Sequence, residues 1–187
     1  MHKQPEITAA TRKRIMDAFW DIYKTTPIEK ITISAITKKA GVHRSTFYEY
    51  FEDIYGVLTQ LENNILDSIQ HNAMAMSSKI SDFDINTFMD TSFSFLIKER
   101  ELMHHLLGPT GDPSFRKRLL QTLKPYFAKI HGLPQSSIYT EYLMTYVFSV
   151  IINALDFAYE HQDQVNIEDL AKMTFKLFDE GMHNFTI

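Results

Sequence analysis

Residues 32–51 read TISAITKKAGVHRSTFYEYF and predict two short helices joined by a tight turn. Thr32 is placed to cap the first helix, because a threonine hydroxyl accepts a hydrogen bond from an amide of the first turn. Gly41 suits the turn, since glycine adopts the left-handed conformation without a Cβ clash. Phe47 and Phe51, four residues apart, share one face of the second helix, which we expect to be buried. This pattern is typical of a helix-turn-helix whose second helix enters the major groove of DNA.

The same stretch resembles the DNA-binding motif of the TetR family of one-component transcriptional regulators, roughly T-x-x-x-I-A-x-x-A-G-V-S-x-x-T-x-Y-x-Y-F. The positions that match are Thr32, Ile36, Ala40, Gly41, Val42, Thr46, Tyr48, Tyr50 and Phe51. Two positions depart from the family. Thr37 replaces the usual alanine at the contact between the two helices, which predicts looser packing there. Ile54 replaces a lysine that commonly contacts phosphate.

The resemblance implies an all-α fold with an N-terminal three-helix head and a larger helical bundle, about nine helices in total. We expect residues 1–52 to form the DNA-binding domain, with its motif at about 31–51. This head is too small to be robust alone, so it should pack on the start of a helix at 54–78. Residues 53–187 are then the ligand-binding and dimerisation domain.

The charge of the chain is unevenly distributed. Its net charge of −4 would by itself argue against a nucleic-acid-binding protein. Residues 1–50, however, hold nine Lys or Arg against five Asp or Glu, whereas residues 51–187 hold ten against eighteen. The basic segment coincides with the helix-turn-helix pattern, which favours attraction to DNA phosphates at that end of the chain.

The composition is that of a soluble globular protein, with 44% hydrophobic and 22% charged residues. The absence of cysteine excludes disulfides and thiolate metal sites. No apolar run approaches the ~20 residues of a membrane span, and the N-terminus lacks the apolar core of a secretory signal. We therefore expect a cytoplasmic protein that does not interact with membranes.

Hydrophobic periodicity predicts helices along most of the chain. Besides the helix-turn-helix, the expected helices are at about 8–23, 54–78, 85–98, 101–107, 114–131, 137–161 and 166–185. Gly56 lies near the start of the long helix predicted at 54–78. It indicates either a hinge or, more simply, a close packing contact. Residues 12–14, two arginines and a lysine near the start of the first helix, could reach phosphates or a minor groove, or could be a solvated basic patch.

The helix at 137–161 carries two apolar stripes, one from Tyr139 to Phe157 and one from Val147 to Ala158. Two stripes predict burial on two faces, more than the core of a single chain requires. In the TetR family the last two helices pair with those of a second copy, so we expect a homodimer through these helices. A large monomeric core is the alternative.

DNA-contacting residues follow from the motif. Arg44 and Thr46 are suited to base edges, with His43 as a further candidate for reading sequence. The other contacts would position the protein on phosphates. The full predicted set is Thr32, Lys39, His43, Arg44, Ser45, Thr46, Tyr48 and Tyr50.

An effector site is expected among the aromatic residues of the second domain, because pockets in helical bundles are apolar with a few polar groups. The candidates are Phe88, His104, Phe127, Tyr142, Tyr146 and Asn153. His104 and His105 are adjacent on a helix and point about 100° apart, so they would not chelate one metal ion. No catalytic, metal or cofactor motif is present, and we expect no enzyme activity.

These observations favour a ligand-responsive repressor that binds a near-palindromic operator as a homodimer and releases it when a small molecule binds. Activation instead of repression is compatible with the same sequence. The alternative from another class is a helical co-regulator or interaction module whose head binds a protein. A helical-bundle enzyme is a more distant third.

Overall fold

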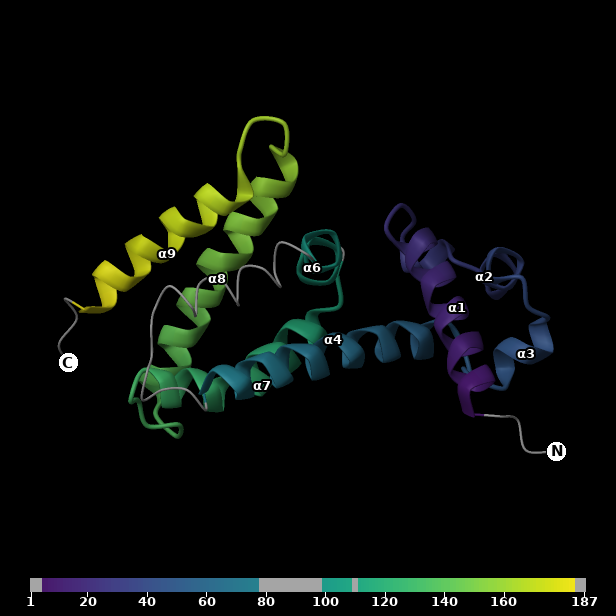
Figure 1. The fold of residues 1–187 in the computed structure, drawn as a ribbon, viewed down its shortest axis with the longest axis horizontal. Helices are drawn as coiled ribbons and strands as arrows, with labels where there is room; N and C mark the ends of the chain where they lie inside the picture. The colour runs from purple at the N-terminus through teal and green to yellow at the C-terminus, as the bar shows by residue number, and fades with distance from the viewer. Residues whose placement is uncertain (1–4, 78–98, 109–110, 184–187) are drawn as a thin grey trace. The chain divides into compact units, whose positions relative to one another are not determined.

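The computed structural model describes residues 5–77, 99–108 and 111–183. Within these ranges the chain forms eight α-helices and one short 3-10 helix, and no strand (Figure 1). The predicted all-α class is confirmed. The helix expected at 85–98 lies outside the described residues. The chain divides into two compact units, residues 1–65 and 66–187.

The helices end close to where the sequence predicts. Their bounds are α1 (Pro5–Tyr23), η1 (Ile28–Lys30), α2 (Ile33–Ala40), α3 (Arg44–Tyr48), α4 (Ile54–Ser77), α6 (Arg100–Leu107), α7 (Pro113–Ile130), α8 (Ile138–Glu160) and α9 (Ile167–His183). Residues of α4 belong to both units.

Large apolar side chains fill the interior of the first unit. Ile15 and Phe19 of α1, Ile36 of α2, Phe47 of α3 and Val57 of α4 are all completely buried. Burying one such side chain contributes roughly 1.5–3 kcal/mol to folding. Helix α1 therefore supplies the apolar surface against which the helix-turn-helix is held.

The turn between α2 and α3 forms as the sequence predicts. The Thr32 hydroxyl accepts a hydrogen bond from the Ala35 amide at 3.2 Å, so the N-cap of α2 is confirmed. Gly41 takes the left-handed conformation, with φ 62° and ψ 41°. The Val42 amide then donates to the Thr37 carbonyl at 3.1 Å, which closes the end of α2.

The second helix of the motif is shorter than expected. We expected it to include Phe51, but α3 ends at Tyr48. The Glu49 amide bonds to the carbonyl three residues back, at 3.2 Å, and this tighter pattern ends the α-helix. The prediction that Phe47 and Phe51 share a buried face is nevertheless confirmed, because both are buried and their ring centroids lie 5.8 Å apart.

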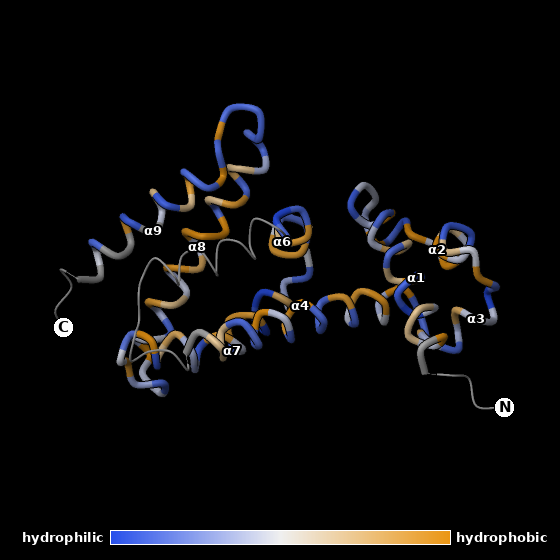
Figure 2. The backbone as a smooth tube through the Cα atoms, in the orientation of Figure 1, coloured by the Kyte–Doolittle hydropathy of each residue, from blue (hydrophilic) through white to orange (hydrophobic). Residues whose placement is uncertain are grey.

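Helix α8 is the centre of the second unit. It packs against α6, α7 and α9. The tube in Figure 2 carries hydrophobic stretches along the length of α8. Buried residues come from every packed helix and include Leu102, Met103, Leu106, Phe115, Leu119, Met144, Val147, Ile152, Ala158 and Ala171.

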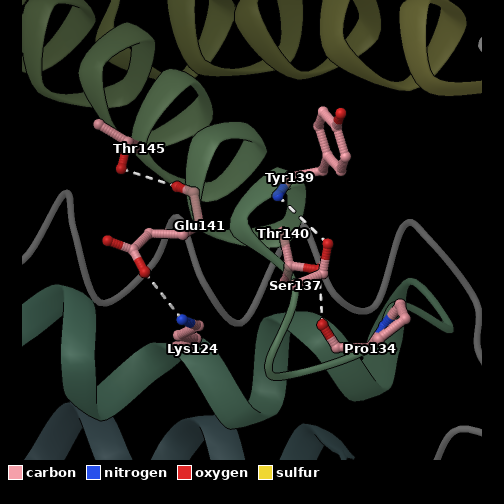
Figure 3. A network of polar contacts seen from close by, with 7 residues as sticks. All are labelled: Lys124, Pro134, Ser137, Tyr139, Thr140, Glu141 and Thr145. Carbon is pink, nitrogen blue, oxygen red and sulfur yellow. Dashed lines mark hydrogen bonds and ion pairs between the residues drawn. The ribbon is translucent and has the colours of Figure 1, made fainter.

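Polar contacts fix the start of α8 to α7 (Figure 3). Thr140 is buried, and its hydroxyl donates to the Pro134 carbonyl at 2.8 Å. The next residue, Glu141, forms an ion pair with Lys124 of α7 at 3.0 Å. Ser137 caps the helix by accepting a hydrogen bond from the Tyr139 amide. The direction in which α8 leaves the α7–α8 loop is therefore specified by side chains.

Asn166 caps α9, which begins at Ile167, one residue after the predicted start. Its side-chain oxygen accepts hydrogen bonds from the amides of Glu168 at 2.8 Å and Asp169 at 3.4 Å. The helix continues to His183.

Candidate DNA interface and effector surface

The DNA-contacting residues predicted around the start of α3 lie at the surface of the first unit. His43, Arg44 and Ser45 are exposed, whereas Thr46 is half-buried. The adjacent Phe47 is fully buried and anchors α3 to the core of the unit. The short helix therefore presents polar side chains on one side while a single aromatic residue holds the other.

Two of the predicted residues contact each other. Arg44 Nη2 donates to the Tyr48 hydroxyl at 3.1 Å, and the guanidinium carbon lies 5.7 Å from the centroid of the Tyr48 ring. Both side chains are exposed. The contact holds Arg44 along α3, so a base contact by Arg44 would compete with its contact to Tyr48.

Lys39, predicted to contact the DNA backbone, forms an ion pair with Asp21 of α1. Its ammonium lies 3.2 Å from Asp21 Oδ2. Lys24 lies 3.7 Å from the other oxygen of the same carboxylate. The hydrogen bond from Lys39, together with the charges of both lysines, holds the pKa of Asp21 below its usual value of 3.8. No sequence motif indicated this contact, since Asp21 and Lys39 lie on different helices.

The three basic residues 12–14 do not act as one patch. Arg12 lies with its guanidinium carbon 5.9 Å from the Tyr50 ring centroid. Lys13 is exposed and pairs with Asp17 in its own helix at 2.7 Å. Arg14 donates to the carbonyls of Ala40 and Gly41, at 2.6 and 3.1 Å. Each side chain therefore has its own partner in the first unit.

Three positions that the sequence marked as unusual have clear environments. Thr37 is buried with its hydroxyl donating to the Ser34 carbonyl at 3.2 Å, so the added polar atom is satisfied within α2. Ile54 is half-buried at the first position of α4. The close packing contact proposed for Gly56 is wrong. A Cβ there would meet only Asp53 Oδ1, at 3.6 Å, and the Gly56 amide bonds to the same oxygen at 2.8 Å.

The predicted effector residues separate into two groups. His104 and Phe127 are half-buried, on α6 and α7. Tyr142, Tyr146 and Asn153 instead lie exposed on α8, where Tyr142 and Tyr146 retain 67% and 57% of their accessible surface. Phe88 lies outside the described residues.

His104 belongs to a cluster that joins α6 to α8. Its Nδ1 lies 2.8 Å from Asp156 Oδ1, and its ring stacks on Tyr159 with centroids 3.9 Å apart. His105 meets both rings edge-on, at 5.5 and 6.2 Å. Asp156 and Tyr159 were not among the residues predicted from the sequence. Their spacing of three on α8 places them on one face, but nothing in the sequence indicated that α6 would pack there.

The part of the chain that the structure describes holds no group of three His, Cys, Asp or Glu placed to bind a metal ion. His104 and His105 have rings at 86° to each other and separate hydrogen-bond acceptors, Asp156 and the Glu101 carbonyl.

One face of α8 is apolar and exposed. The large exposed hydrophobic residues of the second unit's last two helices are Ile138, Tyr139, Tyr142, Tyr146, Val150, Phe157, Met173 and Leu177. The expectation of no membrane-length apolar segment was wrong for this helix. By length and composition α8 is apolar enough to cross a membrane. Only 22% of its most apolar 18-residue stretch is buried. The same property describes a helix that buries a second face against another protein chain.

Comparisons with known proteins agree with this architecture. A family model described as "Transcriptional regulator C-terminal region" matches residues 84–180, slightly more than half of the chain. A curated relative, the uncharacterized HTH-type transcriptional regulator YxbF of Bacillus subtilis (strain 168), is 22% identical over 164 residues, 83% of this chain. The chain spans 42% of the length of that relative.

Solved structures share the fold at low sequence identity. The fatty acid degradation regulator FadR from Bacillus halodurans is 17% identical, with a TM-score of 0.66 over 95% of this chain and 96% of its own. FadR from Bacillus subtilis, solved in complex with stearoyl-CoA, is 17% identical, with a TM-score of 0.64 over 88% and 96%. A third structure, a regulator from Streptococcus agalactiae 2603V, is 20% identical, with a TM-score of 0.62 over 92% and 95%.

Proposed function

The chain belongs to the TetR family of transcriptional regulators, and from this premise we propose that it binds a near-palindromic operator as a homodimer and releases it on binding a small molecule. Residues 1–52 would be the DNA-binding domain and residues 53–187 the regulatory domain. The protein would act in the cytoplasm and would have no catalytic role.

The observation that carries the DNA-binding proposal is the presentation of α3. His43, Arg44 and Ser45 are exposed at its start, and the fully buried Phe47 fixes its inner face. Arg44 can form bidentate hydrogen bonds to guanine, which is a common specific contact in the major groove. Tyr48 and the half-buried Thr46 and Tyr50 would add phosphate or base contacts on the same short segment.

The first experiment measures duplex binding by the full chain. Protection of one palindromic segment near the protein's own gene would supply the operator, and fluorescence anisotropy would then give affinities at several salt concentrations. We expect a steep fall of affinity with salt and competition by the operator only. Absence of duplex binding even at low salt would contradict the proposal and would favour a head that binds a protein.

Arg44→Ala then separates base reading from phosphate binding. Loss of a bidentate base contact should weaken operator binding by ~1–3 kcal/mol and relax specificity at one base pair. Equal weakening on operator and scrambled DNA would make Arg44 a phosphate contact instead. Lys13→Ala is the matched control, because Lys13 is exposed and pairs within its own helix.

The homodimer would form through α8 and α9. Two copies of α3 are needed to read two half-sites, and a two-fold interface places them symmetrically. The pairing would cover the exposed apolar face of α8 together with the exposed Met173 and Leu177 of α9. Tyr142 and Tyr146 fit this role better than the effector pocket in which the sequence placed them, because both lie on that exposed face.

An effector would bind in the second unit, where the half-buried His104 contacts Asp156 and Tyr159 between α6 and α8. Effector binding can shift the operator-bound population only if the two states bind the molecule with different affinity. Long-chain acyl-CoA is the first probe, since the similar FadR of Bacillus subtilis was solved with stearoyl-CoA. Release of operator by stearoyl-CoA but not by free coenzyme A would support an apolar effector. No effect of either would exclude this class.

A further inference from the structure

Arg14 reaches from α1 to the turn of the helix-turn-helix. Its Nη2 atom donates to the Ala40 carbonyl at 2.6 Å and to the Gly41 carbonyl at 3.1 Å. These acceptors lie 26 and 27 residues further along the chain, at the point where α2 ends. All three residues belong to the first unit. A side chain of α1 therefore contacts the backbone that determines where α3 begins.

The chemistry of these acceptors suits a cation. The last carbonyls of an α-helix have no acceptor role within the helix, and they carry the negative end of the helix dipole. A guanidinium donates charge-assisted hydrogen bonds, which are shorter and stronger than those of neutral donors. The 2.6 Å contact to Ala40 has this character.

The turn itself leaves little room for another arrangement. Gly41 has φ 62°, a conformation that disfavours any side chain, and a Cβ built there would lie 3.1 Å from Arg14 Nη2. The next amide, of Val42, is already bonded to the Thr37 carbonyl. Arg14 thus packs against the glycine while it bonds to the glycine carbonyl, and the two residues fix the turn together.

We propose that Arg14 is a positioning residue for operator recognition, which sets the orientation of α3 instead of contacting phosphate. The proposal rests on the proposed DNA-binding function. Arg12 and Lys13 are its neighbours in sequence but not in role, since Arg12 lies over Tyr50 and Lys13 pairs with Asp17. The three residues, which looked equivalent in the sequence, should respond differently to substitution.

The test compares Arg14→Ala with Lys13→Ala in the full chain, on operator and on scrambled duplex, across a salt series. Each variant removes one positive charge from adjacent positions of α1. For Arg14→Ala we expect operator affinity to fall roughly ten- to a hundredfold, the equivalent of one hydrogen bond to a charged group. Binding to scrambled duplex should change no more than it does in Lys13→Ala.

Two results on DNA would overturn the proposal. An equal loss on both duplexes, with the salt slope reduced by about one contact, would make Arg14 a phosphate ligand. Unchanged operator binding would mean that Arg14 has no role in operator recognition. Arg14→Lys gives a second reading, because lysine keeps the charge but has no planar fork. A phosphate contact would survive this change, whereas positioning should be restored only in part.

A measurement without DNA tests the positioning of α3 by Arg14 separately from the proposed DNA-binding function. Amide hydrogen exchange at residues 41–47 should accelerate in Arg14→Ala relative to wild type and Lys13→Ala, while the amides of α1 keep their protection. If exchange at the turn is unchanged in Arg14→Ala, the positioning role is overturned even if the protein binds its operator.

If exchange accelerates in Arg14→Ala but the wild-type protein binds no duplex, Arg14 positions α3 and the proposed DNA-binding function is contradicted. If Arg14→Ala does not fold, Arg14→Lys carries both measurements.

Discussion

Lys39 has a carboxylate partner before any DNA is present. Its ammonium lies 3.2 Å from Asp21, on a different helix of the same unit. A phosphate that approaches Lys39 must displace this carboxylate or share the ammonium with it. Both side chains are nearly half exposed, so solvent screens the pair and its contribution to stability is small. The pair therefore affects binding electrostatics more than it affects folding.

The Asp21 pair gives a dependence of stability on pH with a defined sign. The pKa of Asp21 is below 3.8 in the folded protein because Lys39 and Lys24 stabilise its charged form. The pair is therefore fully stabilising above pH 3.8, and this contribution is lost as the pH falls through the lowered pKa. Asp21→Asn should lower the free energy of unfolding at pH 7 by about 1 kcal/mol or less.

Trp20 provides the measurement, since it is the single tryptophan of the chain and lies on α1 beside Asp21. Denaturant unfolding followed by its fluorescence should show the two proteins converging as the pH is lowered below 3.8. A difference that stays constant with pH would contradict the assignment. Asp17→Asn is the control, because its partner Lys13 lies in the same helix.

His104 is the residue that ties α6 to α8 by both a hydrogen bond and a ring stack. His104→Ala should therefore lower the free energy of unfolding of the second unit by about 1–2 kcal/mol. His105→Ala should cost less, since the His105 hydrogen bond goes to the Glu101 carbonyl within α6. The stabilities of the two variants can be compared by thermal unfolding, monitored by circular dichroism. Equal effects would mean that the Asp156 contact contributes nothing specific.

At the scale of elements, two glycines that look alike in the sequence should have opposite effects when replaced. Gly56 lies in the first turn of α4 with room for a Cβ, so Gly56→Ala should stabilise α4 by up to about 1 kcal/mol. Gly41→Ala should destabilise by about 1 kcal/mol or more, because the turn requires a positive φ. The midpoint of denaturant unfolding, followed by Trp20 fluorescence, measures the stability change in both variants. A destabilised Gly56→Ala would mean that α4 needs a hinge there.

Elements were predictable from the sequence where a local signal determines them. Thr32, Gly41 and Asn166 mark helix ends by side-chain or backbone chemistry that acts within a few residues, and all three do so in the structure. The end of α3 was not predictable in this way. The match to Phe51 suggested a longer helix, but α3 ends at Tyr48, where the Glu49 amide bonds to the carbonyl three residues back.

Contacts between helices could not be predicted. Arg14 with Ala40, Asp21 with Lys39 and His104 with Asp156 each join residues far apart in the chain. A single sequence reveals which face of a helix is apolar, but not which polar residue of another helix will lie opposite it. Tyr142 and Tyr146 were placed in a pocket for the same reason. Their spacing predicts a shared face, and only the structure shows that the face is exposed.

For the whole molecule, the exposed face of α8 gives a direct test of assembly. Tyr146 lies near the middle of that face and is 57% exposed, so Tyr146→Glu should leave the protomer folded. In a homodimer, however, it would place two carboxylates in an apolar interface, where an unpaired charge is costly. We expect a shift from dimer to monomer in analytical ultracentrifugation, together with loss of operator affinity.

The matched control for this test is Gln121→Glu, which adds the same charge at an exposed position of α7. It should leave both the mass and the operator affinity unchanged. A Tyr146→Glu variant that remains dimeric would place the interface elsewhere. A monomeric wild-type protein would favour the alternative of a large single-chain core.

The division of labour around α3 has an evolutionary consequence. Two of the candidates for reading bases, His43 and Arg44, are exposed, while Phe47, Gly41 and Arg14 hold the segment in place. Substitutions at the exposed positions therefore put little of the fold at risk. A duplicated copy of this regulator could acquire a different operator through one or two such changes and remain stable throughout. Its descendants would diverge fastest at the surface that distinguishes one promoter from another.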